Sequence, residues 1–241
     1  MFLDAFHVVD KDLVRISAQQ ASRFAKDVAG DYNPIHDADA KRFCVPGDLL
    51  FCLVLNRYGL SQQMRFSFTG MVGDGVGLRF PDSDAARLEI TDEAGKVYLQ
   101  VDREGALSRD AEPRESLSRR YVEFSGQNFP HILAPLMAKH RVMINLDRPL
   151  VIYESMSLQL DRLDFADPVL ELTDSMLDVN GKRGDAHLQF AISAGGRTVG
   201  TGSKKLVLSG LREYDGDVLE AFLSEYERRV GANQERVRAG C

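Results

Sequence analysis

One short segment of the chain holds residue types that can carry out acid–base chemistry. Residues 30–37 read Gly-Asp-Tyr-Asn-Pro-Ile-His-Asp, which places Asp31 five positions before His36. Gly30 ends a helical pattern, and Pro34 prevents the following loop from resuming a helix. A carboxylate and an imidazole on such a stiffened loop can both point at one water molecule, as general acid–base catalysis requires.

This pair matches the needs of one reaction in particular. Addition of water across a double bond conjugated to a thioester needs a base that takes a proton from water. It also needs an acid that returns a proton to the α-carbon, and a group that holds the developing enolate oxygen. Asp31 and His36 can meet the first two needs, and their loop lies between two expected helices, where it can border a cleft.

Three segments resemble a known family. Residues 30–36 resemble the hydratase motif of the MaoC-like family, which includes (R)-specific enoyl-CoA hydratases. Residues 45–50, Val-Pro-Gly-Asp-Leu-Leu, are similar to the start of that family's central helix, and residues 66–74 are similar to a later signature. All three lie in the first half of the chain and in the family's order. The length and layout also resemble an uncharacterised bacterial double hot-dog family.

The resemblance implies a function and a set of site residues. Asp31 and His36 would be the catalytic pair, and Asn33 and Pro34 would support the loop. The amide of Gly47 or of its neighbour Asp48, at the positive end of a helix, would bind the thioester oxygen. The implied activity is hydration of enoyl thioesters or dehydration of (R)-3-hydroxyacyl thioesters, with acyl-CoA or an acyl-carrier protein as partner and without a cofactor.

Two departures from the family pattern keep other functions open. The segment between His36 and Gly47 is shorter than in typical hydratases, and Asp48 replaces a methionine. A carboxylate there either stabilises the helix dipole or opposes negative charge on the substrate. The alternative function is therefore a non-catalytic acyl-CoA or acyl-carrier binding module, and a thioesterase is a third possibility. In a protein without this activity, Asp31 would be a turn residue and His36 a structural histidine.

The elements expected around the loop follow from spacing and capping. Ser17 and Gln20 form a capping box that opens a helix over residues 18–28. A helix that is apolar nearly all round follows Pro46 and Gly47, over residues 48–58. Strands are predicted over residues 12–16, 64–68, 75–80, 87–91 and 96–103.

The second half repeats this order. Residues 111–120 are predicted to be a linker, followed by a strand over 121–124, a helix over 130–140, and strands over 150–160, 169–179, 185–193 and 198–208. The repeat predicts an α+β double hot-dog, in which two antiparallel sheets are each wrapped around a buried helix and are continuous in one chain. The predicted units are residues 1–110 and 121–210, and residues 211–241 carry a C-terminal helix over 215–238.

Two further segments contain polar residues that could bear on function. Residues 126–131, Gly-Gln-Asn-Phe-Pro-His, faintly resemble the first motif, with Gln127 in place of the carboxylate. This makes the same chemistry impossible in the second half. Lys204 and Lys205 are interpreted as an exposed strand pair in preference to a phosphate site.

Composition limits the class of protein. The chain has 241 residues and a formal net charge of −6, which argues against a nucleic-acid binder. Cys44, Cys52 and Cys241 are an odd set without metal-ligand spacing, so neither a metal site nor a disulfide framework is expected. No signal peptide or membrane span is visible, and a cytoplasmic monomer or homodimer is predicted.

Overall fold

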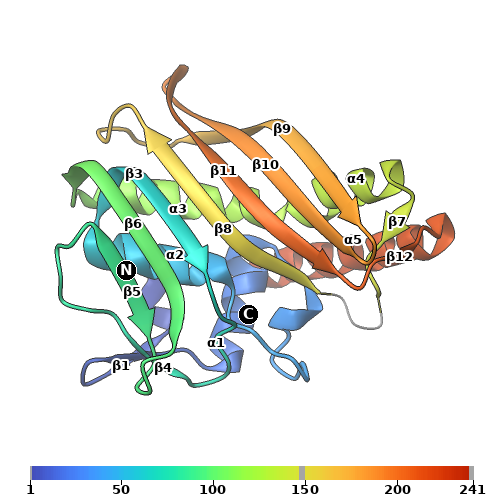
Figure 1. The fold of residues 1–241 in the computed structure, drawn as a ribbon, viewed down its shortest axis with the longest axis horizontal. Helices are drawn as coiled ribbons and strands as arrows, with labels where there is room; N and C mark the ends of the chain where they lie inside the picture. The colour runs from blue at the N-terminus through green and yellow to red at the C-terminus, as the bar shows by residue number, and fades with distance from the viewer. Residues whose placement is uncertain (1, 147–149, 239–241) are drawn as a thin grey trace.

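The computed structural model describes residues 2–146 and 150–238, and it is built on one sheet of ten antiparallel strands. The order across the sheet is β1-β2-β4-β5-β6-β3-β8-β11-β10-β9 (Figure 1). The strands of the first half are β1 (Val8–Asp10), β2 (Leu13–Arg15), β3 (Leu60–Phe68), β4 (Gly77–Arg79), β5 (Arg87–Thr91) and β6 (Val97–Ser108). Those of the second half are β8 (Val151–Leu160), β9 (Val169–Asn180), β10 (Arg183–Ala194) and β11 (Arg197–Ser209). β7 (Val142–Met143) and β12 (Arg212–Glu213) form a separate small sheet.

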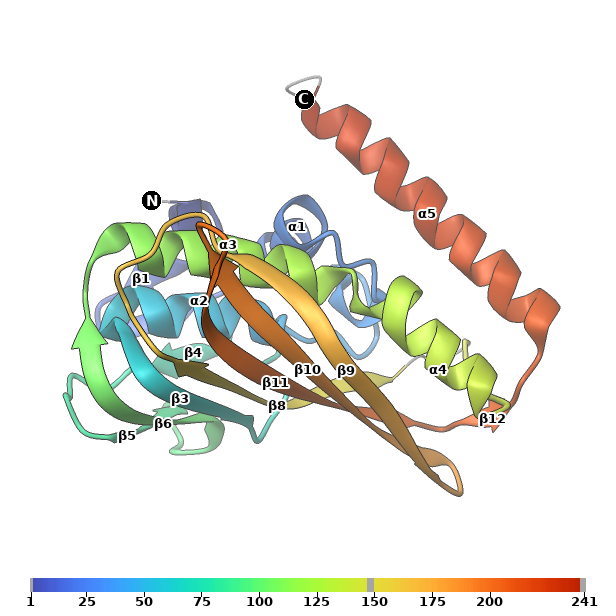
Figure 2. The ribbon, with the colours of Figure 1, turned by 90° about the horizontal axis from the view of Figure 1, so that it is seen from above.

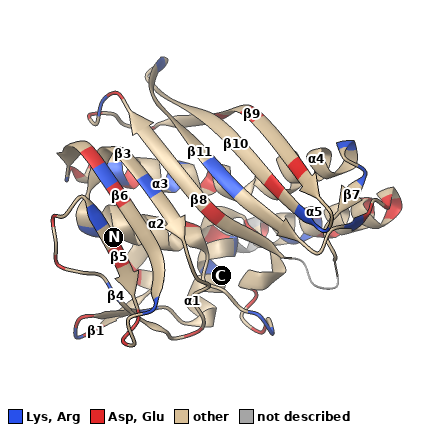
Figure 3. Ribbon diagram, viewed as in Figure 1, with Lys and Arg blue, Asp and Glu red and all other residues tan. Residues whose placement is uncertain are grey.

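The two halves of the large sheet are joined by a direct strand pair. β3 pairs with β8 in antiparallel register, from Gln63 opposite Gln159 to Ser67 opposite Ser155. Charged residues lie on β8, β10 and β11 of the second half (Figure 3), and on one face of these strands Lys205 forms ion pairs with Glu154 and Asp185. The other face of these strands packs against the core.

Helix α2 (Gly47–Tyr58) is the buried helix of the first half, as predicted. Nearly all of its side chains are buried, and it lies against the sheet behind β3 and β6 (Figure 1). Before it come a short 3-10 turn, η1 (Phe2–Ala5), then α1 (Ala18–Arg23), η2 (Phe24–Ala29) and η3 (Pro34–His36). The predicted capping box of Ser17 and Gln20 is present at the start of α1.

The helix of the second half begins much earlier than predicted. α3 (Ala111–Gly126) is followed by η4 (Phe129–Leu133) and α4 (Ala134–Lys139). The strand predicted over residues 121–124 was wrong, and residues 111–120 are helical instead of forming an extended linker. Pro113 lies in the first helical turn, where proline is tolerated. The buried residues of α3 recur at helical spacing and pack beside α2: Leu117, Ser118, Tyr121, Val122 and Ser125.

The fold is thus an α+β double hot-dog, with the C-terminal helix α5 (Gly216–Arg238) added to it. The domain limits given above stay a prediction. α5 starts near β12 and lies on the outside of the molecule (Figure 2). Its side chains Leu219 and Tyr226 are buried. Within the described ranges, no helix combines the length and the apolar character that crossing a bilayer would take.

Candidate functional site

The loop that carries Asp31 is shaped by local hydrogen bonds. η2 ends at Gly30, whose φ of 65° is a left-handed conformation that glycine adopts without strain. Asp31 Oδ1 then accepts a bond from the Asn33 N–H at 2.8 Å, and Asn33 Oδ1 accepts one from the Ile35 N–H at 3.3 Å. Pro34 opens the 3-10 turn that ends at His36. One oxygen of Asp31 thus has the local bond of a turn residue, and the other is available to its surroundings.

His36 is held in one orientation by the chain that follows it. Its side chain is buried, and its Nδ1 lies 2.7 Å from the carbonyl oxygen of Cys44. A carbonyl can only accept a hydrogen bond, so Nδ1 carries a proton. In the neutral imidazole Nε2 is therefore an acceptor, and this atom lies 3.6 Å from Asp31 Oδ2. The structure brings the two predicted catalytic side chains together.

The facing atoms of this pair set a chemical requirement. A neutral imidazole Nε2 and a carboxylate oxygen are both acceptors, and two acceptors cannot satisfy each other. A water molecule beside them can donate one hydrogen to each, which leaves its lone pairs free for attack on an electrophile. An imidazolium would instead form an ion pair with Asp31. The geometry of the loop is suited to both states of His36.

Helix α2 begins directly next to this pair. Gly47 is its first residue, and close packing explains why a glycine stands there. A Cβ atom at this position would lie 2.8 Å from a ring carbon of Tyr153 and 3.1 Å from one of Phe68. The absent side chain leaves the backbone at the positive end of the helix open to the space lined by Asp31 and His36.

Asp48, the second residue of α2, does not cap the helix. Its side chain is 6% exposed and its Oδ2 accepts a 2.6 Å bond from the hydroxyl of Ser125 on α3. Lys204 on β11, only 5% exposed, bonds to the same hydroxyl oxygen and lies over the ring of Tyr153, 4.1 Å from its centroid. The prediction that Lys204 is exposed was therefore wrong. Burial raises the pKa of Asp48, while the charge of Lys204 opposes this, and burial lowers the pKa of Lys204.

Two adjacent cavities meet at His36, Gly47, Val151 and Tyr153, which line both. We call the larger one, of about 250 Å³, the apolar groove; its other lining residues include Leu50, Phe68, Met71, Val72 and Ile152. We call the smaller one, of about 70 Å³, the polar chamber; it is lined by polar side chains from both halves: Asp31, His36, Asp48, Ser125, Asn128 and Lys204. An apolar channel next to a small polar space is suited to a ligand with a reactive head and an apolar arm.

The second half supplies polar residues that the sequence-based analysis missed. Asn128 lies in the segment 126–131 that resembles the first motif, and Gly126 packs against the end of η2: a Cβ there would lie 1.7 Å from the carbonyl oxygen of Ala29. For Lys204 a signal was present in the strand alternation. It is in phase with Leu206 and Leu208, which face the core.

The C-terminal helix ties the two motif segments together. The hydroxyl of Tyr226 accepts a 3.1 Å bond from the Tyr32 N–H. The same hydroxyl lies 3.1 Å from the carbonyl oxygen of Gly30 and 3.4 Å from that of Gly126, to which it can donate. Because Tyr32 follows Asp31 directly, this contact holds the backbone of the candidate site.

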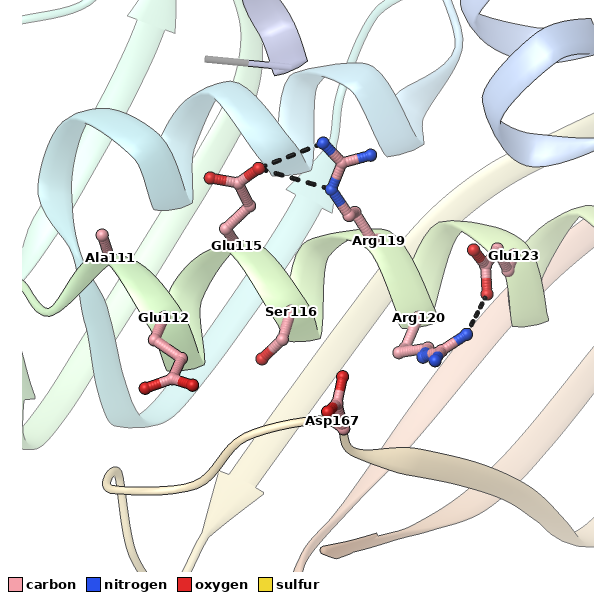
Figure 4. A pocket seen from close by; sticks show the side chains of 8 residues that line it. All are labelled: Ala111, Glu112, Glu115, Ser116, Arg119, Arg120, Glu123 and Asp167. Carbon is pink, nitrogen blue, oxygen red and sulfur yellow. Dashed lines mark hydrogen bonds and ion pairs between the residues drawn. The ribbon is translucent and has the colours of Figure 1, made fainter.

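A surface depression of about 600 Å³ lies elsewhere, along α3. Figure 4 shows its charged side chains, of which Glu115 pairs with Arg119 and Arg120 with Glu123 along the helix. These exposed groups satisfy one another, so the depression offers little to a ligand. In the part of the chain that the structure describes, no three His, Cys, Asp or Glu side chains are grouped as metal ligands would be.

Several solved structures are similar to this chain at low sequence identity. A tesB protein from Mycobacterium avium subspecies paratuberculosis is 9% identical, with 68% of this chain and 87% of that chain covered and a TM-score of 0.44. The acyl-CoA thioesterase II TesB2 from Mycobacterium marinum is 12% identical over 87% of this chain and 96% of that one, with a TM-score of 0.41. A MaoC-like dehydratase is 9% identical over 86% and 99% of the two chains, with a TM-score of 0.39.

No curated protein has a sequence significantly similar to this one. A family model described as "Protein of unknown function (DUF3581)" matches residues 1–217, and the chain belongs to that family.

Proposed function

We propose that this protein adds water to enoyl thioesters, or removes it from (R)-3-hydroxyacyl thioesters, at the Asp31–His36 pair. The observation that carries the proposal is the 3.6 Å approach of His36 Nε2 to Asp31 Oδ2 at the wall of a cavity that also contains the start of α2. Acyl-CoA or an acyl-carrier protein would deliver the substrate.

The proposed reaction uses the two acceptors to activate water. The oxygen of the water attacks C3 of the enoyl group. The C2=C3 π-electrons then move toward the thioester, whose carbonyl oxygen becomes an enolate oxygen. The proton lost by the water passes to the Asp31–His36 pair, and the pair returns a proton to C2 as the thioester carbonyl re-forms. The Gly47 amide, at the positive end of α2, would bind the enolate oxygen. The apolar groove would hold the apolar arm of the substrate.

The direct test is a hydratase assay with crotonyl-CoA and longer enoyl-CoAs, followed by the loss of enoyl absorbance. Asp31→Asn and His36→Ala should each lower kcat by about 10²–10⁴-fold, the usual contribution of a general acid or base. Asp39→Asn, the same change at an exposed position beyond the turn, is the matched control and should leave the rate unchanged. Equal rates in the wild type and in both site variants would refute the proposal.

A non-catalytic acyl-thioester binding module is the second candidate. One observation favours it: the buried carboxylate of Asp48 adjoins Gly47, where it would oppose charge on a thioester oxygen. This candidate predicts thermal stabilisation by acyl-CoA together with no turnover of any enoyl-CoA. A thermal-shift series run beside the hydratase assay distinguishes the two functions.

A further inference from the structure

Asn128 has a side chain whose position calls for a ligand. It is 3% exposed, it lines the polar chamber, and neither its amide nitrogen nor its amide oxygen has a hydrogen-bond partner among the described residues. More than about 90% of buried polar groups are hydrogen-bonded in proteins, and an unsatisfied one costs about 1–3 kcal/mol. An uncompensated amide in this place is therefore expected to bind something that enters the chamber.

The neighbours of Asn128 show which kind of atom that is. The same chamber contains Gly47, at the positive end of α2, and the pair of Asp31 and His36. An oxygen atom that enters opposite the reacting carbon would meet the Gly47 amide from the first half and the Asn128 amide from the second. Two such donors aimed at one oxygen are the usual means of stabilising an oxyanion.

The charge of Asp48 would weaken such a site unless something offsets it. Ser125 and Lys204 supply that offset, because Ser125 donates to Asp48 Oδ2 and Lys204 bonds to Ser125. The two charges can be no more than about 6 Å apart, since both groups bond to one hydroxyl oxygen. Lys204 therefore offsets the charge of the Asp48 carboxylate through their shared partner Ser125.

We propose that the side-chain Nδ2 of Asn128 is the second donor to the thioester oxygen, opposite the Gly47 amide, and that Lys204, acting through Ser125, is a positioning residue that offsets Asp48. The inference rests on the proposed function and deepens it. The second half, which has Gln127 where the first motif has its carboxylate, thus supplies one of the two oxyanion donors, and the site is composed of residues from both halves.

The test uses acetoacetyl-CoA, whose β-ketoacyl thioester ionises to an enolate with its own near-ultraviolet absorbance. Binding is measured by calorimetry, and the apparent ionisation pH of the bound ligand by spectroscopy. The wild type should shift this pH downward relative to the free ligand. Asn128→Leu, which is similar in size and lacks the donor, should lose roughly tenfold to a hundredfold of the ionisation constant, and kcat with crotonyl-CoA should fall by about 10²-fold at nearly constant KM.

Two comparisons make the outcome decisive. Gln127→Leu, the same change at the exposed neighbouring position, should behave as wild type, and Asn128→Ser, which retains a donor, should recover part of the shift. Binding with an enolate shift in Asn128→Leu equal to that of the wild type would overturn the assignment alone, leaving the amide with a structural water. Failure of the wild type to bind the ligand at all would overturn the acyl-thioester function and the assignment with it.

Discussion

Replacement of Lys204 by methionine tests the buried network most sharply. The methionine keeps the length of the side chain and removes its charge, so Asp48 would remain buried with only Ser125 as partner. At a separation of about 6 Å and an effective dielectric constant of about 20, the lost attraction is about 3 kcal/mol. This agrees with the roughly 3–5 kcal/mol lost when one partner of a buried ion pair is removed.

The second variant isolates the interaction from the loss of packing. Asp48→Asn combined with Lys204→Met removes both charges, so the double variant should be more stable than Lys204→Met alone by about 1–3 kcal/mol. The free energies of unfolding come from urea titrations of the wild type, the two single variants and the double variant. A cost below about 1 kcal/mol for Lys204→Met, or a double variant no more stable than that single one, would refute the reasoning.

The pH dependence of Lys204→Met has a definite sign. Burial already raises the pKa of Asp48 above 3.8, and the variant removes the charge that most opposes this rise. Between pH 3.8 and the raised pKa of Asp48 in the folded variant, the folded state holds a proton that the unfolded chain has lost. The contribution of Asp48 to the stability of the variant therefore falls as pH rises through this range. The deficit relative to wild type should be larger at about pH 8 than at about pH 5. A deficit that grows as pH falls would contradict the assignment of charge.

Three further substitutions have expected outcomes. Gly47→Ala brings a Cβ within 2.8 Å of the Tyr153 ring and should cost about 1–3 kcal/mol in urea unfolding. It should also lower the acyl-CoA affinity measured by calorimetry, and an unchanged affinity would show that Gly47 is not part of the binding site. Gly126→Ala should lower the melting temperature strongly, because its Cβ meets a backbone carbonyl oxygen. Gly231→Ala, with open space around it on α5, is the control and should be neutral or slightly stabilising. Equal melting temperatures for the two variants would argue against the packing of Gly126. Tyr226→Phe removes three hydroxyl contacts, so the free energy of unfolding should fall by about 1–3 kcal/mol and kcat should also fall. A variant as active and as stable as the wild type would show that α5 does not hold the loop.

Much of the fold was predictable because it depends on local patterns. The capping box at Ser17, the apolar run over residues 49–55 and the alternating strands each have a local pattern of their own. No part of α3 was predicted to be helical, because its exposed face is charged and Tyr121 and Val122 favour strands when taken alone. Only packing beside α2 makes their helical spacing decisive.

The candidate site divides in the same way. The local bonds of the loop from Asp31 to His36 follow from its own sequence, through the turn chemistry of Asn33 and Pro34. The polar chamber does not, because Asp48 and Lys204 are 156 positions apart and meet only through the sheet that joins the two halves. A lysine in phase with leucines was a sign of burial, but its partner lay beyond the reach of any local pattern.

The hydroxyl of Tyr226 contacts the backbone of Tyr32 from 194 positions further along the chain. During synthesis the ribosome releases α2 and its strands long before it releases α5. Nascent chains that have not reached residue 226 can therefore form much of the sheet but lack the contact that fixes the loop. The bend from Asp31 to His36 should become rigid late in biosynthesis, so truncated chains can fold in large part while the candidate site is not yet fixed.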